Sequence, residues 1–140
     1  MKGVFADTAY YLALVTPGDG YHSAAVGRSL GLTGRVVVTE FVLLEVGNTL
    51  SGSRRRSAFP DLVRELQADP NTEVIPLSQA LFEKGVELYA ARPDKDWSVT
   101  DCISFVVMRQ RGLTEALTAD RHFEQAGFKA LLREAPPERH

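Results

Sequence analysis

The sequence lacks the features of a secreted, membrane-spanning or strongly basic protein. Its 140 residues include a single cysteine, Cys102, so no disulfide can form within the chain, and one thiol is too few for a thiolate metal site. No apolar run approaches the roughly 18 residues of a membrane span, and Asp7 interrupts the apolar start too early for a signal peptide. We therefore expect a cytoplasmic protein with no membrane contact. The net charge of −2 means that any binding to nucleic acid must be local.

Several catalytic motifs are also missing. The chain has neither a Gly-x-Gly-x-x-Gly nor a Walker loop, which argues against dinucleotide binding and NTP hydrolysis. Its histidines, His22, His122 and His140, are scattered, with no serine elbow and no His-Glu-x-x-His pair. Histidine-based or zinc-based hydrolysis therefore has little support, and Cys102 is interpreted as a small core residue.

What is present is a chain able to build one packed α/β domain. Hydrophobic residues make up 44% and charged residues 24%, and the length suits one domain over 1–134 with a short tail at 135–140. Short apolar runs alternate with amphipathic segments, which predicts a three-layer α/β/α sandwich with a mainly parallel sheet. The expected strands are Gly3–Ala6, Val36–Thr39, Glu73–Pro76, Ala116–Thr118 and Lys129–Leu132. The expected helices are Tyr10–Val15, Tyr21–Leu32, Glu40–Leu50, Pro60–Gln67, Ser78 to the break at Arg92, Ser98–Met108 and a short turn or helix at Phe123–Ala126.

Two acids fall at the ends of expected strands. Asp7 follows the first strand and Asp120 follows the strand at 116–118, and parallel sheets bind ligands beyond the carboxyl ends of their strands. Each acid also has a purely structural interpretation, as the N-cap of the next helix or as a turn residue. Neither acid decides the function alone.

Two further acids lie in helices. Glu45 sits in an apolar helix, where burial of a carboxylate would cost several kcal/mol without compensation; the alternative is a polar stripe with Asn48 and Thr49 that reaches solvent. Asp101 is the third residue after Ser98, which also fits a capping box. If the fold gathers all four acids, their repulsion implies a hard divalent cation such as Mg²⁺ or Mn²⁺, which suits phosphodiester hydrolysis.

The chain resembles the PIN-domain nucleases, and within them the small toxins of the VapC type. Four segments in order carry the resemblance, and together they span nearly the whole chain: Val4–Thr8, Val38–Val46, Ser98–Cys102 and Leu117–Phe123.

The resemblance implies a metal-dependent endoribonuclease. It implies that Asp7, Glu45, Asp101 and Asp120 line a Mg²⁺ or Mn²⁺ site, with Thr8 and Thr118 as hydroxyl support and Asp96 as an outer carboxylate. It also implies an RNA substrate, a small inhibitory antitoxin and a homodimer. Arg54, Arg55 and Arg56 follow the Glu45 helix and are expected to bind the RNA backbone, unless they form a solvated loop.

Other functions remain open. A stand-alone RNA-processing nuclease would carry the same acids, and a non-catalytic α/β interaction module would have no reason to hold a metal ion. Phosphoryl transfer through an aspartyl intermediate would also place an Asp after the first strand, but Asp7-Thr8-Ala9 lacks the second acid that such phosphatases place there.

Overall fold

The computed structural model of the protein describes residues 3–134, which form a five-stranded sheet covered by helices. The strands are β1 (Val4–Ala6), β2 (Val36–Thr39), β3 (Thr72–Ile75), β4 (Glu115–Leu117) and β5 (Lys129–Ala130). The helices are α1 (Thr8–Val15), α2 (His22–Leu30), α3 (Glu40–Leu50), α4 (Ala58–Ala68), α5 (Gln79–Ala91), α6 (Val99–Arg111), α7 (Arg121–Gln125) and the 3₁₀ helix η1 (Leu131–Arg133).

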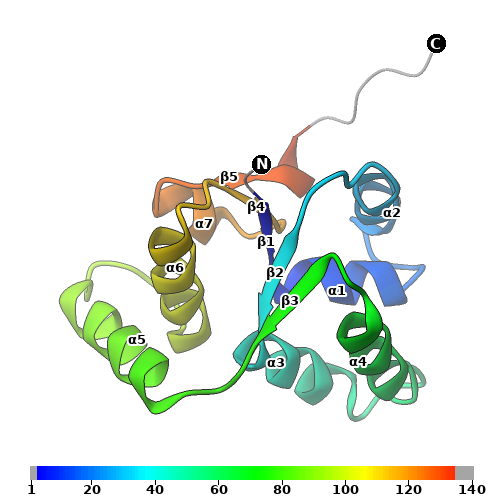
Figure 1. Ribbon diagram of the computed structural model, residues 1–140, viewed down its shortest axis with the longest axis horizontal. Coiled ribbons are helices and arrows are strands. Elements are labelled where there is room, and N and C mark those ends of the chain that lie inside the picture. The colour runs from blue at the N-terminus through cyan, green and yellow to red at the C-terminus, as the bar shows by residue number, and fades with distance from the viewer. Residues whose placement is uncertain (1–2, 135–140) are drawn as a thin grey trace.

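The sheet has the order β3-β2-β1-β4-β5, and every neighbouring pair is parallel. Figure 1 shows α5, α6 and α7 on one side of the sheet and α1, α2 and α4 on the other. The predicted three-layer α/β/α architecture with a parallel sheet is therefore confirmed. The strand order reverses between β1 and β4, and the crevice outside the carboxyl ends of two such strands is the usual ligand site of this architecture.

The central strands form because their residues suit burial on both faces. All four residues of β2, Val36–Thr39, are buried, as expected for a parallel strand covered by helices on each side. Thr39 then starts α3, and its hydroxyl accepts a hydrogen bond from the Val42 N–H at 3.1 Å. The predicted cap at this residue is confirmed, and it turns α3 away from the carboxyl end of β2.

An aromatic cluster holds α6 and α7 together beside the sheet. The ring of Phe105 on α6 lies 5.0 Å from that of Trp97, 4.9 Å from that of Phe123 and 5.7 Å from that of Phe128, measured between centroids. Phe105 and Phe123 are fully buried. This packing fixes α6 and α7 relative to each other.

The last expected strand, Lys129–Leu132, is wrong in its length. β5 contains only Lys129 and Ala130, which pair with two residues of the three-residue strand β4. The chain then leaves the sheet edge as η1, and the Leu132 N–H donates to the Thr118 carbonyl at 3.1 Å. A short neighbouring strand offers too few backbone partners for a longer one.

The division into a domain over 1–134 and a tail stays a prediction, since residues 135–140 lie outside the described residues. No helix in the described part of the chain combines the length and apolar character needed to cross a membrane.

Candidate active site

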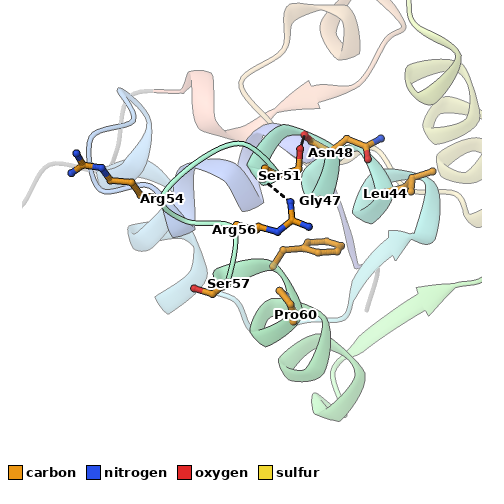
Figure 2. Close-up of a pocket in the computed structure, with 9 residues that line it drawn as sticks. Leu44, Gly47, Asn48, Ser51, Arg54, Arg56, Ser57 and Pro60 are labelled. Carbon is orange, nitrogen blue, oxygen red and sulfur yellow. Dashed lines mark hydrogen bonds between the residues drawn. The ribbon is translucent and has the colours of Figure 1, made fainter.

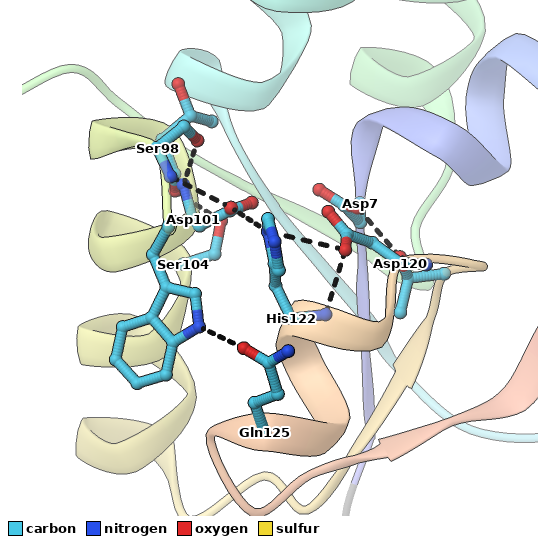
Figure 3. Close-up of polar contacts among 10 residues, drawn as sticks. Asp7, Ser98, Asp101, Ser104, Asp120, His122 and Gln125 are labelled. Atoms are coloured by element: carbon cyan, nitrogen blue, oxygen red, sulfur yellow. Dashed lines mark hydrogen bonds and ion pairs between the residues drawn. The ribbon is translucent and has the colours of Figure 1, made fainter. Parts of the chain in front are cut away.

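Asp7 and Asp120 lie at the carboxyl ends of β1 and β4 (Figure 3). Thr118 connects them through its hydroxyl. The Thr118 hydroxyl donates to Asp7 Oδ2 at 2.8 Å, and its oxygen accepts from the Asp120 N–H at 3.0 Å. The Asp7 N–H donates to the Leu117 carbonyl at 3.1 Å, which holds the two strand ends together. Asp7 precedes α1, but its side chain makes no capping hydrogen bond, so capping does not explain this acid.

Asp101 reaches the same edge from the first turn of α6. Its Oδ2 accepts from the Ser98 N–H at 3.0 Å, and the Ser98 hydroxyl accepts from the Asp101 N–H at 3.0 Å, so the predicted capping box is confirmed. The same Oδ2 lies 3.0 Å from His122 Nδ1. Capping and a place in the acid cluster are therefore compatible for this residue.

Glu45 is half-buried on α3 rather than enclosed in the core. Asn48 and Thr49, one turn further along the helix, are exposed, so this face of α3 reaches solvent as the polar-stripe alternative proposes. The expectation of a costly buried carboxylate is wrong for Glu45. Its charge nevertheless contributes to the raised pKa of Asp7, which places Glu45 on the periphery of the cluster.

The surroundings of Asp7 and Asp101 disfavour the charged form of both carboxylates. Burial, with smaller contributions from the charges of Asp101 and Glu45, raises the pKa of Asp7 from 3.8 to about 7, against the hydrogen bonds from Thr118 and from the Thr8 backbone. Burial also raises the pKa of Asp101, against the hydrogen bonds from Ser98 and His122. Within residues 3–134, neither Asp7 nor Asp101 forms an ion pair with a lysine or arginine.

These observations fit a site for a cation. The hydroxyl of Thr8, directly after Asp7, is buried and has no hydrogen-bond partner in the described part of the chain. A buried hydroxyl normally has a partner, so Thr8 Oγ1 is free to bind a group that enters the site. Asp101, Asp120 and His122 each offer one ligand atom, and these three atoms lie within 4.8 Å of one another.

His122 is the residue that the sequence reasoning missed. It is the second residue of α7, and its N–H donates to Oδ1 of the N-cap residue Asp120 at 2.8 Å. Its Nδ1 lies 3.4 Å from Asp120 Oδ1 and bridges toward Asp101 (Figure 3). The available signal was its place two residues after an acid that follows a strand.

Asp96 lies outside this hydrogen-bonded network. It is exposed in the loop between α5 and α6, and it makes no side-chain hydrogen bond to the four acids among the residues that the structure describes.

The three arginines lie beyond the end of α3, next to a pocket of about 680 Å³ between α3 and α4 (Figure 2). Leu44 and Phe59 supply apolar walls, Asn48 supplies an amide, and Arg54 and Arg56 line the same pocket. All three arginines are exposed, and Arg56 Nη1 donates to the Ser51 carbonyl at 2.7 Å. The loop is therefore solvated, as the alternative interpretation has it, but one of its guanidinium groups is held at the pocket.

Comparison with known proteins identifies the family. The PIN domain family model matches residues 4–129, so the chain belongs to the PIN domain family. The chain is also 28% identical over 125 residues to the 23S rRNA-specific endonuclease VapC20 of Mycobacterium tuberculosis, across 89% of this chain and 95% of that protein.

Solved structures agree with this fold. The crystal structure of Mycobacterium tuberculosis VapC20, described as a sarcin-ricin loop cleaving toxin, has a TM-score of 0.83 and 25% identity, and the match covers 90% of this chain and 96% of that one. The VapBC2 complex of Rickettsia felis bound to a promoter DNA fragment has a TM-score of 0.64 at 12% identity, covering 91% and 96%.

Proposed function

We propose that the protein is a metal-dependent endoribonuclease of the VapC toxin type, which hydrolyses phosphodiester bonds in RNA. The observation that carries the proposal is the meeting of Asp7, Asp101 and Asp120 at the edge where the strand order of a PIN-domain sheet reverses. The similarity to a 23S rRNA-specific endonuclease supports RNA as the substrate class.

Asp7, Glu45, Asp101 and Asp120 are the residues proposed to hold Mg²⁺ or Mn²⁺ and to act in catalysis. When bound, such a cation polarises a phosphodiester and lowers the pKa of a water molecule. Thr118 keeps Asp7 Oδ2 oriented, and Ser98 does the same for Asp101 Oδ2. Because the pKa of Asp7 is about 7, a proton on its carboxylate competes with the cation at neutral pH. We propose that Thr8, whose hydroxyl has no partner within residues 3–134, supports the site, and that Asp96 is an outer acid.

Removal of divalent cations tests this proposal. We expect RNA digestion in the presence of Mg²⁺ or Mn²⁺ and none with EDTA, because the acids repel the scissile phosphate unless a cation neutralises them. Gel analysis of two RNAs, one that folds into a hairpin and one that cannot form base pairs, would show whether paired or unpaired RNA is cut. Equal cleavage with and without EDTA would contradict a metal mechanism. A protein that binds no Mn²⁺ by titration calorimetry would instead be an interaction module.

Arg54, Arg55 and Arg56 are proposed to bind the RNA backbone rather than to take part in chemistry. Replacing all three by alanine should raise KM several-fold and reduce its dependence on salt, while kcat stays close to that of the unchanged protein. The side chains are exposed, so the fold should tolerate the change. The measurement is steady-state cleavage at several salt concentrations, with Arg64→Ala, an exposed arginine on α4, as the control. A fall in kcat alone would show that the arginines act in the chemical step.

We further propose a small antitoxin as the partner that inhibits the site. Two structural neighbours are VapBC complexes bound to DNA, at 12% and 16% identity. An arginine of the partner can form a bidentate pair with a carboxylate and cannot lose its proton, so it suits Asp7 and Asp101, which have no lysine or arginine partner within residues 3–134.

Co-expression with a neighbouring small reading frame tests this partnership. The two proteins should co-purify, RNA cleavage should be inhibited, and an Arg→Ala change in the partner's tail should restore cleavage. If the complex forms and this change alters neither affinity nor inhibition, charge competition is not the inhibitory mechanism. The absence of any partner would favour a stand-alone processing nuclease.

A homodimer is proposed from the exposed apolar side chains. Phe82, Val86 and Tyr89 recur at helical spacing on one face of α5, and they are 47%, 41% and 53% exposed. Leu77, 51% exposed, lies beside the first turn of α3, because its N–H donates to Glu40 Oε1 at 2.8 Å. We propose that a second copy of the chain covers the α5 face of Phe82, Val86 and Tyr89, and these three are the residues to change in a test of oligomeric state.

A further inference from the structure

His122 occupies the position between two of the acids. Its Nδ1 lies 3.0 Å from Asp101 Oδ2 and 3.4 Å from Asp120 Oδ1, so it contacts a carboxylate from α6 and another from the β4–α7 junction. Its side chain is 24% exposed, whereas those of Asp101 and Asp120 are 11% and 34% exposed. The imidazole and the two carboxylates therefore lie together in one partly solvent-exposed cluster.

Their separations suit the ligands of a metal ion as well as a hydrogen bond. Two ligand atoms at about 2.1 Å from an ion and at right angles to each other are about 3.0 Å apart, and about 3.4 Å apart at a tetrahedral angle. The distances from Nδ1 to the two carboxylate oxygens, 3.0 and 3.4 Å, match these values.

The backbone that carries the imidazole is held in place from two directions. The N-cap hydrogen bond from the His122 N–H to Asp120 Oδ1 fixes the first turn of α7. The next residue, Phe123, is fully buried against Phe105 of α6. A side chain that is placed this firmly loses little entropy when it binds a ligand.

Two further observations point to a ligand at this carboxyl-terminal edge of the sheet. The Thr8 hydroxyl, beside Asp7, is buried without a partner among the residues described. In the same part of the chain, the only side chain that forms an ion-pair contact with Asp101 or Asp120 is His122 itself. An imidazole contact alone leaves most of the carboxylate charge uncompensated.

We propose that His122 supplies a nitrogen ligand to the divalent cation of this site, and that this nitrogen makes the site select Mn²⁺ over Mg²⁺. The inference rests on the proposed nuclease function and adds to it. Mg²⁺ prefers oxygen ligands in a strict octahedron, whereas imidazole suits first-row transition ions. An acid site with one nitrogen donor should therefore discriminate between two cations that an all-oxygen site accepts more evenly.

Pulsed electron paramagnetic resonance of the full chain with bound Mn²⁺ tests the ligand directly. We expect the coupling of a directly coordinated nitrogen in the unchanged protein, its loss in His122→Asn, and its retention in His22→Asn. His22 is the matched control, because it is a partly buried histidine whose Nδ1 contacts the Ala13 carbonyl instead of the acids. Absence of a nitrogen coupling in the unchanged protein would overturn the inference even if His122→Asn fails to fold.

Titration calorimetry measures the selectivity. The ratio of Mn²⁺ to Mg²⁺ affinity should fall by about tenfold in His122→Asn and stay unchanged in His22→Asn. A spectrum with oxygen ligands only, or an unchanged ratio in a folded His122→Asn variant, would overturn the inference. Metal-dependent RNA cleavage alongside such a result would leave the proposed function standing, whereas the absence of any cation binding would overturn both.

Discussion

Substitution of Asp7 by asparagine is expected to lower RNA cleavage by about 100-fold or more without unfolding the protein. Asparagine keeps the size of the side chain, and its amide oxygen can still accept the hydrogen bond that Thr118 donates to Asp7 Oδ2 at 2.8 Å. The change therefore removes the charge proposed to hold a cation and little else. The measurement is the single-turnover cleavage rate with saturating Mn²⁺, with circular dichroism as a check on folding.

Asp69→Asn is the matched control for this experiment. Asp69 is an exposed acid in the turn before β3, at the amino end of the strands and thus at the opposite edge of the sheet. Its cleavage rate should stay within about twofold of the unchanged protein, as for most surface changes away from a site. If Asp7→Asn retains more than half of the activity, Asp7 is not part of the catalytic site; if it unfolds, Asp7 has a structural role.

The same change at other acids is harder to interpret. Asp101 accepts from the Ser98 N–H and completes the capping box of α6. Asp120 accepts from the His122 N–H at the start of α7. A loss of activity at either position would mix lost chemistry with a disturbed helix start. Asp7 makes no such capping bond, so its variant isolates the electrostatic contribution.

The sequence predicts an element well when the conformation that its own residues favour is also the one that buries them in the fold. The β-branched run of β2 and the caps at Thr39 and Ser98 are readable because one residue type decides each of them. The length of β5 is not readable, because it depends on how many backbone partners β4 presents at the sheet edge. Edge strands are determined by their neighbours more than by their own residues.

The acid cluster likewise contains residues whose positions the sequence predicts and one whose position depends on packing. Parallel strands bring Asp7 and Asp120 to one edge, so their proximity follows from predicting the strands correctly. The position of His122 depends on the rotation of α7 against α6, which the packing of Phe123 on Phe105 determines. That packing involves residues far apart in the chain, and a single sequence contains no pattern that reports it.

The stability of Asp7→Asn should exceed that of the unchanged protein at pH 8 without divalent cations. The folded state raises the pKa of Asp7 from 3.8 to about 7, so the folded protein binds this proton more tightly than the unfolded chain does. Stability from this group is therefore present below about pH 4, falls as pH rises toward 7 and is fully lost above it. Asparagine has no proton to lose, and the shift corresponds to about 4 kcal/mol.

Chemical denaturation at pH 4 and pH 8 in EDTA measures this difference. The two proteins should unfold at similar denaturant concentrations at pH 4, and the variant should be the more stable at pH 8. Asp69→Asn should behave oppositely, because hydrogen bonds from Asn71 and Thr72 lower the pKa of Asp69 and stabilise its charged form. Equal stability of the Asp7→Asn variant and the unchanged protein at pH 8 would show that the Asp7 charge costs the fold nothing.

Addition of Mn²⁺ should offset most of this stability deficit of the unchanged protein at pH 8, because a cation that binds only the folded protein stabilises it by mass action. At 100 times its dissociation constant, the gain is about 2.7 kcal/mol. The unchanged protein should show this gain, and Asp7→Asn should show little of it, since one of the proposed ligands has lost its charge. At pH 5 the gain should shrink in the unchanged protein, because a proton then occupies Asp7 and competes with the ion. Equal stabilisation of both proteins by Mn²⁺ would place the ion away from Asp7, whereas a gain confined to the unchanged protein and growing from pH 5 to pH 8 would link metal binding to this carboxylate.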